Sequence, residues 1–195
     1  MRTTPEQRIK EFNQRGWWGS ETLDSIFITA VAKNGSETAL VDQFNRNEFT
    51  DGTPYRLSFT ELANAAENLA IDFYKNGLRR DDTVIVQLPN IAELAVLYLA
   101  LGKLGVILSP VPIQYGSFEL KKAIQLVEPA AFISLSNFKG KNFADKHGAA
   151  FPEGCSSFCF GDEAPKDAIS LSLNTEEPII NIEYQRYLSS LELSA

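Results

Sequence analysis

The sequence predicts an α/β fold in which a parallel sheet carries helices on both faces. Helices and strands alternate from Ser58 to Leu135, giving three strands joined by two helical crossovers. That order requires parallel strands with right-handed connections and helices packed on the sheet. The clearest unit runs from Thr83 to Pro112, with a short β-branched strand, a stop at Pro89, an almost wholly apolar helix and a second strand.

The helix of this unit has signals at both ends. Asn90 is a good N-cap, and Glu93 follows at the spacing of a capping box. Gly102 and Gly105 bracket its C-terminal end. The segment from Ile91 to Leu101 is apolar on nearly its whole circumference, which predicts burial on most sides. A membrane-spanning helix is the alternative, but the short apolar run, the internal charges and the absence of basic flanks favour a buried α/β unit.

The N-terminal part is predicted to be an arm with helices and one short strand. Pro5 to Arg15 has helical spacing of its apolar residues and is followed by Gly16. We expect Trp17 and Trp18 to anchor the arm on the body by burying a large area, with ligand stacking as the alternative role. The further elements expected here are a helix from Thr22 to Lys33, a strand from Thr38 to Asp42 and a turn or hairpin loop from Asn45 to Tyr55.

The segment from Leu57 to Gly77 carries the strongest helix signal in the chain. Ser58 and Glu61 have the spacing of a capping box, and Leu57 with Leu62 can form a hydrophobic staple. The apolar residues between them and Phe73 follow one helical face. Gly77 supplies the left-handed residue that ends such a helix.

Beyond Pro112 the pattern continues through one more crossover and then weakens. Ser117 is the expected N-cap of a helix that runs to Val127. The segments expected after it are a buried strand from Ala130 to Leu135, a polar surface segment from Asn137 to Gly148, a strand from Ser156 to Phe160, an acidic loop from Gly161 to Glu177, and a stretch from Ile179 to Leu193 that fits either a strand or an amphipathic helix. The chain divides into an arm (1–56), a βαβ core (57–135) and a loop-rich extension of the same domain (136–195).

Composition limits the classes of partner and the compartment. The 195 residues are 44% hydrophobic and 22% charged, with a net charge of −7. This balance, without any basic block, argues against nucleic acid or an anionic membrane as the main partner. No apolar run opens the chain, so we expect a cytoplasmic protein. Cys155 and Cys159 are expected to be free thiols rather than a disulfide, and His147 a solvated loop residue.

The residues alone identify no catalytic, cofactor-binding or metal-binding site. The chain has no Gly-x-Ser-x-Gly elbow, dinucleotide or phosphate loop, His-Glu-x-x-His pair or Cys/His cluster. Capping or surface charge best explains the carboxylates Asp24, Asp42 and Glu93. The prediction for site residues is therefore none in any of the three categories.

Several short motifs nevertheless resemble the opening of the adenylate-forming enzymes, the superfamily of acyl-CoA synthetases, peptide-synthetase adenylation domains and luciferases. The motifs are Leu57-Ser58-Phe59-Thr60-Glu61-Leu62, Leu88-Pro89-Asn90, and Leu101-Gly102-Lys103-Leu104-Gly105-Val106 with Pro110 and Pro112. The aryl-acid ligases of siderophore biosynthesis, the 2,3-dihydroxybenzoate–AMP ligase type, are the most similar branch. That branch shares Arg15-Gly16-Trp17-Trp18, Ala65-Ala66-Glu67-Asn68-Leu69-Ala70, Val86-Gln87-Leu88 and Val127-Glu128-Pro129-Ala130, so the likeness runs from about Glu11 to Ser134.

The resemblance implies an incomplete N-terminal piece of the large domain of such an enzyme. The intact parent would use Mg-ATP to activate a carboxylic acid, an aryl acid in this branch, as acyl-AMP and pass it to a phosphopantetheine carrier protein or CoA. Its phosphate loop, acid pocket and catalytic Lys come later in the family pattern. This chain is therefore expected to hold no cofactor, to be inactive alone and to pack against the remainder of its own large domain.

Two alternatives stay open. Within the ligase class, the parent would be an acyl-CoA synthetase. In a different class, the chain would be a stand-alone, non-catalytic α/β binding or regulatory module. Such a module would hold a ligand at loops around Pro89-Asn90 and Pro110 to Gly116. A large exposed apolar patch would favour the piece of a larger domain over the complete module.

Overall fold

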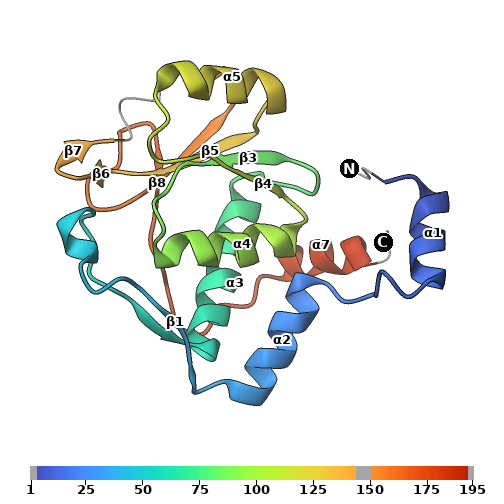
Figure 1. Cartoon of the computed structure of the whole chain (residues 1–195). Coiled ribbons are helices and arrows are strands. Elements are labelled where there is room, and N and C mark those ends of the chain that lie inside the picture. Colours follow the sequence, from blue (N-terminus) through green and yellow to red (C-terminus); the bar gives the residue numbers. More distant parts are fainter. Residues whose placement is uncertain (1–3, 144–150, 193–195) are drawn as a thin grey trace.

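The computed structural model describes residues 4–143 and 151–192, and it confirms the α/β fold with a parallel sheet (Figure 1). Its helices are α1 (Glu6–Gln14), α2 (Leu23–Asn34), the 3-10 helix η1 (Arg46–Glu48), α3 (Phe59–Lys75), α4 (Ala92–Leu104), α5 (Ser117–Val127) and α7 (Ile182–Glu192). Its strands are β1 (Thr38–Val41), β2 (Arg56–Ser58), β3 (Thr83–Val86), β4 (Ile107–Pro110), β5 (Ala131–Leu135), β6 (Asn137–Phe138), β7 (Lys141–Asn142), β8 (Ser156–Phe160) and β9 (Ile169–Leu171).

The central sheet has the strand order β4-β3-β5-β8-β9, and every neighbouring pair is parallel. The predicted strands β3, β4, β5 and β8 are all present. The assignment of Gly161 to Glu177 wholly to a loop is wrong, because it contains β9. This strand is three residues long and only Leu171 is buried, so it shows no alternating pattern that a sequence could display.

Helices cover both faces of the sheet, as expected (Figure 1). On one face, α3 and α4 pack against each other and against Val84, Val86 and Ile133. On the other face, α5 packs over Ile85 and Phe132. Adjacent residues of β3 and β5 thus point into two different apolar layers, which is why both strands are almost continuously hydrophobic.

Helix α3 begins and ends as predicted. The amide of Glu61 donates to Ser58 Oγ at 3.2 Å, and the amide of Ser58 donates to Glu61 Oε2 at 2.8 Å, which completes the capping box. At the other end Gly77 has a φ of 92°, and the amide of Leu78 donates to the carbonyl of Phe73 at 3.0 Å. This is the bonding pattern of a left-handed glycine cap.

The antiparallel hairpin β1–β2 lies beside the sheet and carries η1 in its loop. The loop expected from Asn45 to Tyr55 is therefore confirmed as a hairpin connection, and β2 precedes α3 directly. At the end of the chain, the stretch that fitted either a strand or a helix forms α7. Tyr184 of α7 is fully buried, with its ring 5.8 Å from that of Tyr74.

Two details of the N-terminal and α5 predictions are wrong. Trp17 and Trp18 do not bury their area on the body, since their side chains are 62% and 43% exposed. They pack instead on Phe12 of the same arm, with ring centroids 5.4 and 5.0 Å away, and the arm projects from the body (Figure 1). The N-cap of α5 is Gly116 rather than Ser117.

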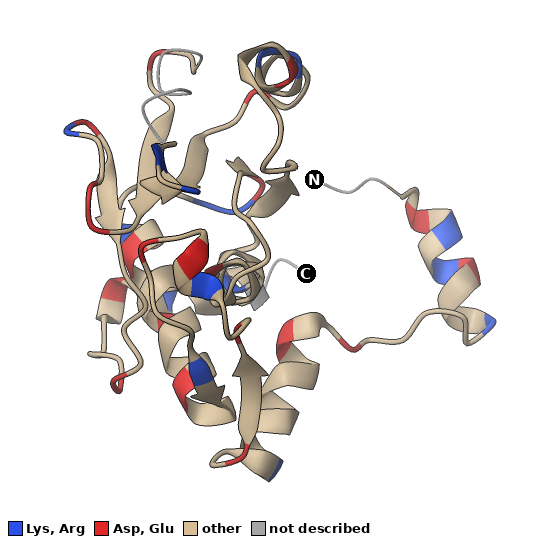
Figure 2. Ribbon diagram, turned by 60° about the vertical axis from the view of Figure 1, so that its left-hand side comes forward, with Lys and Arg blue, Asp and Glu red and all other residues tan. Residues whose placement is uncertain are grey.

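Charged residues of both signs are spread over the ribbon (Figure 2). In the described residues, no helix is long and apolar enough to span a bilayer. The apolar character of α4 instead reflects its burial between α3 and the sheet. The division of the chain at residues 57 and 136 stays a prediction.

Candidate functional site

A pocket of about 400 Å³ lies at the carboxyl ends of β5, β8 and β9. The hairpin loop between β1 and β2 forms its opposite wall. Its lining includes Tyr55, Glu93, Ser136, Phe160, Asp162 and Leu171. Loops at the carboxyl ends of parallel strands are the usual place for ligands in open α/β sheets.

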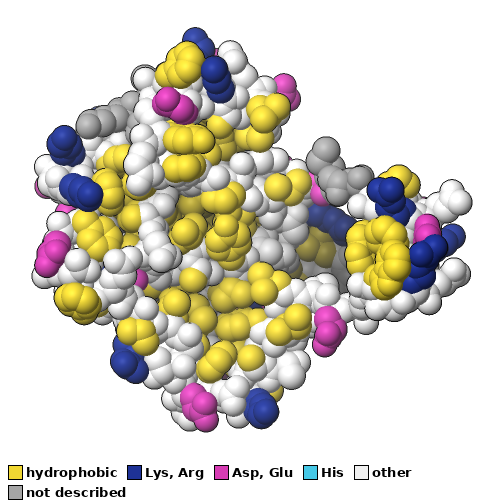
Figure 3. Space-filling model, in the orientation of Figure 1, with side chains coloured by type: hydrophobic (Ala, Val, Ile, Leu, Met, Phe, Trp, Pro, Cys, Tyr) yellow, Lys and Arg dark blue, Asp and Glu magenta, His cyan; other side chains and the backbone are white. Residues whose placement is uncertain are grey.

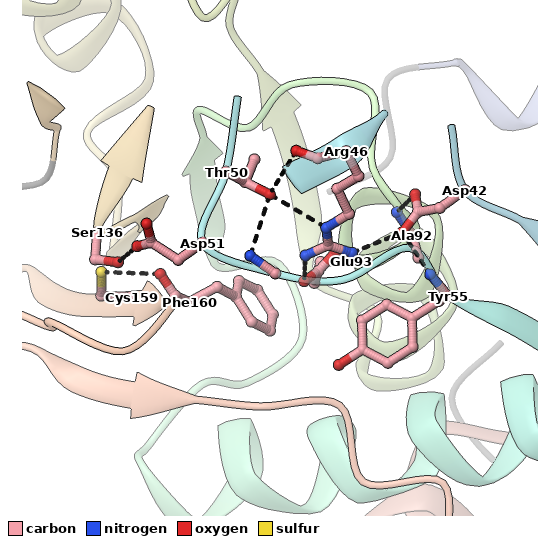
Figure 4. A network of polar contacts seen from close by, with 11 residues as sticks. Asp42, Arg46, Thr50, Asp51, Tyr55, Ala92, Glu93, Ser136, Cys159 and Phe160 are labelled. Atoms are coloured by element: carbon pink, nitrogen blue, oxygen red, sulfur yellow. Dashed lines mark hydrogen bonds and ion pairs between the residues drawn. The ribbon is translucent and has the colours of Figure 1, made fainter. Parts of the chain in front are cut away.

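Arg46 is the centre of a buried polar cluster in the wall of this pocket (Figure 4). Its side chain is only 4% exposed. Nη1 donates to Asp42 Oδ2 at 2.6 Å, Nη2 donates to Glu93 Oε1, and Nε donates to Thr50 Oγ1 at 3.2 Å. The guanidinium carbon lies 5.1 Å from the centre of the Tyr55 ring, a cation–π contact. One guanidinium thus joins η1, the end of β1 and the first turn of α4.

The electrostatics of the cluster keep Arg46 charged. Burial alone would lower the pKa of Arg46, but hydrogen bonds and charge from Glu93, and then from Asp42, offset this and raise it. Burial, followed by the charge of Glu93, also raises the pKa of the Tyr55 phenol. Removing either partner of such a buried ion pair would leave the other charge buried without compensation, which is costly.

Asp42 caps α4 from a distant position in the chain. Its Oδ1 accepts from the amide of Ala92 at 2.8 Å, and its Oδ2 accepts from the amide of Tyr55 at 3.1 Å. The predicted capping role of Asp42 is confirmed, but its target is a helix 50 residues away rather than a local one.

The capping box expected from Asn90 and Glu93 is wrong. Helix α4 begins at Ala92 with Ile91 as N-cap, and Asn90 is exposed. Glu93 is a buried partner of Arg46, so the surface or capping role predicted for it is also wrong. The reason is that a buried guanidinium binds a carboxylate more strongly than a single amide does. Asp24, by contrast, lies at the surface and pairs with Lys103 at 3.2 Å.

Ser136 and Gly161, which follow β5 and β8, form the floor of the pocket. Ser136 Oγ donates to Asp51 Oδ2 at 2.9 Å, and its amide donates to the carbonyl of Phe160 at 2.7 Å. Gly161 has a φ of 108°, and a Cβ there would lie 2.1 Å from Ser136 Oγ. Only glycine fits this close approach of the two strand ends.

The polar side chains that line the pocket are carboxylates, hydroxyls, one amide and one guanidinium. Glu93 Oε2 is buried and has no hydrogen-bond partner among the described residues. In the described part of the chain, no group of three or more His, Cys, Asp or Glu side chains is arranged to hold a metal ion. The hydroxyl of Ser136 is bonded to a carboxylate, which orients it rather than forming a nucleophile–base pair with histidine.

One of the two ligand loops expected of a stand-alone module, Pro110 to Gly116, is held by the side chain of Gln87. Its Nε2 donates to the carbonyls of Pro112 and Tyr115, both at 3.0 Å. The pocket lies at the ends of β5, β8 and β9, and next to the other expected loop, at Pro89-Asn90, it is lined by Ile91 and Glu93. Cys155 and Cys159 are thiols rather than a disulfide, as predicted, and burial raises the pKa of Cys155 to about 11. His147 lies outside the described residues.

Sequence reasoning did not identify the pocket residues Arg46, Asp51, Ser136 and Asp162. A usable signal was present for two of them, because Ser136 follows a buried strand directly and Asp162 follows β8 after one glycine. Polar residues at such strand ends line the binding edge of a parallel sheet. No comparable local signal marks Arg46.

The parallel sheet, the helices on both of its faces and the pocket at its strand ends are typical of α/β domains that bind ligands at one edge of the sheet. Comparison with known proteins makes this specific. Residues 27–176 match the family model described as AMP-binding enzyme. The chain belongs to this family, and the predicted resemblance to adenylate-forming enzymes is confirmed.

The chain is similar to aryl-acid enzymes along most of its length. It is 30% identical over 130 residues to enterobactin synthase component E of Escherichia coli, which covers 67% of this chain and 22% of that protein. It is 29% identical over 139 residues to 2,3-dihydroxybenzoate-AMP ligase of Bacillus subtilis, covering 71% and 24%. The medium-chain fatty-acid–CoA ligase of Escherichia coli is 27% identical over 137 residues, covering 70% and 23%. The chain thus spans about a quarter of the length of these relatives.

Solved structures agree on the fold. The apo structure of MbtA from Mycobacterium smegmatis superposes with a TM-score of 0.64 at 23% identity, covering 80% of this chain and 27% of that one. The α/β architecture is therefore that of part of an adenylate-forming enzyme.

Proposed function

We propose that this chain is the N-terminal portion of an ATP-dependent acid–thiol ligase that activates an aryl acid in the cytoplasm for siderophore biosynthesis. In the first step a carboxylate oxygen attacks the α-phosphorus of Mg-ATP, the bond to the β-phosphate breaks, and acyl-AMP and pyrophosphate form. In the second step a thiol sulfur attacks the acyl carbon, AMP leaves, and the thiol proton is released. The acceptor is a phosphopantetheine carrier protein or CoA.

The observation that carries this proposal is the match to the AMP-binding family together with two aryl-acid relatives that each cover about two thirds of the chain. The chain itself supplies scaffold. Its sheet and helices α3 and α4 form a continuous core, and the buried Arg46 cluster fixes the hairpin loop against α4. We place the phosphate loop, the acid pocket and the catalytic Lys of the parent outside these residues.

Exposed apolar side chains favour the piece of a larger domain over a complete stand-alone module. Figure 3 shows hydrophobic side chains gathered over β4, α4 and α2, and a second group on the arm. Exposed apolar side chains on these elements include Ile107 of β4, Tyr98 of α4, Leu23 and Ile26 of α2, and Trp17 and Trp18 of the arm. Before α7, Ile179 and Ile180 are 87% and 83% exposed. Contiguous exposed apolar surface of this kind marks an interaction surface, here one for the remainder of the large domain.

The test is acid-dependent ATP–pyrophosphate exchange by the intact parent protein that contains this chain. We expect exchange with 2,3-dihydroxybenzoate or salicylate and little with octanoate. Exchange with no carboxylic acid of either kind would overturn the proposal. The 195-residue chain alone is the control, and robust exchange by it would contradict the placement of the catalytic parts elsewhere.

An acyl-CoA synthetase is the second candidate, and the fatty-acid–CoA ligase relative is what supports it. The same assay separates the two candidates. A parent that exchanges with octanoate and forms octanoyl-CoA, but is silent with both aryl acids, would belong to this second class.

A further inference from the structure

We propose that the exposed face of α5 is a docking site for an acidic amphipathic helix of a partner protein. The apolar anchors of this face are Phe118 and Leu126, and its basic residues are Lys121 and Lys122. The face lies on the side of the sheet opposite α3 and α4, so it is separate from the exposed apolar side chains on α2 and α4 (Figure 1). Binding at this face is independent of the ligase reaction proposed above.

Helix α5 is fixed on the sheet, which makes its outer face a preformed surface. Leu120 and Ile124 of its inner face are buried, and they pack over Ile85 of β3 and Phe132 of β5. A partner that binds to the outer face does not have to order the helix first. This lowers the entropic cost of the contact.

The apolar anchors belong to a single row of side chains along α5. Phe118, Lys122 and Leu126 follow one another at i, i+4 and i+8. Phe118 is 66% exposed and Leu126 is 84% exposed, and they lie about 12 Å apart along the helix axis. Rows with this spacing pack into the grooves of a second helix, and amphipathic helices bind through apolar anchors at such intervals. The spacing therefore favours a helix as the occupant.

The charge of the face indicates that this helix is acidic. Lys122 Nζ lies 4.4 Å from the centre of the Phe118 ring, a cation–π contact that holds the ammonium group beside the anchor. Neither Lys121 nor Lys122 makes an ion pair with another of the described residues. The nearby carboxylate of Glu119 is engaged at the start of the helix, where its Oε2 accepts from the amide of Gly116 at 3.0 Å. Carboxylates of a partner would thus meet two uncompensated ammonium groups, although the chain as a whole has a net charge of −7.

The same charges disfavour two other occupants. A second copy docked through this face would place Lys121 and Lys122 against their equivalents, and like charges at an interface are costly. An anionic membrane binds clusters of about four to eight basic residues. Helix α5 offers only these two lysines, with Glu119 in its first turn and Glu128 at its C-cap. A helix with carboxylates beside an apolar row complements both the anchors and the lysines.

The experiment is an NMR titration of the 195-residue chain with two designed amphipathic peptides. Both carry leucine on one face, and the opposite face carries glutamate in one peptide and lysine in the other. We expect the glutamate peptide to shift the amide signals of α5, and the lysine peptide to bind about tenfold more weakly, the size expected for two exposed ion pairs. The double variant Lys121→Glu with Lys122→Glu should reverse this preference. Lys75→Glu is the matched control, because this exposed lysine belongs to α3 on the opposite face of the sheet.

The apolar anchors have a matched pair of variants of their own. Leu126→Ser should weaken binding of the glutamate peptide severalfold. Ile179→Ser should leave it unchanged, because it removes a similarly exposed apolar side chain that lies before α7. Both positions are at the surface, so neither change removes a contact of the core.

Several results would overturn the proposal. These are equal binding of the two peptides, equal weakening by Leu126→Ser and Ile179→Ser, or shifts confined to elements other than α5. Concentration-dependent shifts of the α5 amides without peptide would assign the face to a second copy instead. Loss of peptide binding in the intact parent protein would assign it to the remainder of the large domain.

Discussion

Helices α3 and α4 lie side by side in the core, yet their N-terminal ends are held in different ways. In the sequence, each start carries a residue of a type that favours the N-cap position with glutamate three positions later, Ser58 with Glu61 and Asn90 with Glu93. At α3 the pair bonds to itself, and Glu61 stays exposed. At α4 the glutamate is buried against Arg46, and Asp42 supplies the cap.

The difference shows that one spacing can serve either a local cap or a tertiary contact. What decides is burial. Glu61 is in water, where a backbone amide is its best available partner, and the net gain is modest. Glu93 is beside the pocket and under the hairpin loop, where a guanidinium is available and water is not. The α4 end therefore depends on residues 47 and 50 positions away.

The largest effect is expected from Arg46→Ala. It removes the common partner of Asp42 and Glu93 and leaves two buried carboxylates without a counter-charge. We expect the free energy of unfolding to fall by about 3–5 kcal/mol, the usual cost of breaking a buried pair from one side. Urea denaturation followed by circular dichroism measures it.

The control for this variant is Arg56→Ala in β2. Arg56 is exposed and donates to Thr38 Oγ1 at 3.0 Å, so its removal takes away a similar side chain without stranding a buried charge. We expect a change below about 1 kcal/mol, as for other exposed polar contacts. Equal losses for the two variants would contradict the tertiary account of the α4 end.

Local signals explain how much of the fold could be predicted. Strands β3, β5 and β8 are runs of buried residues, and α3 carries its caps within its own sequence. β9 was missed because three residues with one buried side chain carry no pattern. Trp17 and Trp18 were misplaced because their size predicts contact but not which surface provides it.

The candidate site was not predictable in the same way. Arg46, Glu93 and Ser136 come from three separate segments, and only the fold brings them to one pocket. A lone arginine in a polar loop is normally solvated, so nothing local marks Arg46 as buried. The sequence could place the edge of the sheet, but not the partner that each polar side chain meets there.

A smaller effect is expected from Ser58→Ala at the start of α3. The substitution removes the side-chain acceptor for the Glu61 amide, and we expect a loss of about 1 kcal/mol, as for other N-cap serines. Thermal or urea unfolding of the variant beside the native chain measures it, and an unchanged stability would mean that the capping box contributes nothing.

The pH dependence of the same capping box gives an independent measurement. The amide and the hydroxyl of Ser58 lower the pKa of Glu61 below its ordinary value of 4.5. A carboxyl whose pKa is lowered by folding stabilises the folded state above its unfolded pKa, and this stabilisation is lost as pH falls through the folded value. The stability difference between the native chain and Glu61→Gln should therefore shrink below pH 4.5. A difference that stays constant down to lower pH would contradict the assignment.

The smallest effect is expected from Asn90→Ala, and it tests the comparison most directly. If Asn90 capped α4 as Ser58 caps α3, its removal would cost about 1 kcal/mol. Its side chain is exposed and makes no hydrogen bond among the described residues, and its carbonyl, which accepts from Gln43 Nε2 at 3.1 Å, survives the substitution. We therefore expect a change within about 0.5 kcal/mol, as for an ordinary surface position. The measurement is urea unfolding of Asn90→Ala and Ser58→Ala in parallel. Equal losses in the free energy of unfolding would show that Asn90 caps α4 locally and would contradict the capping role of Asp42.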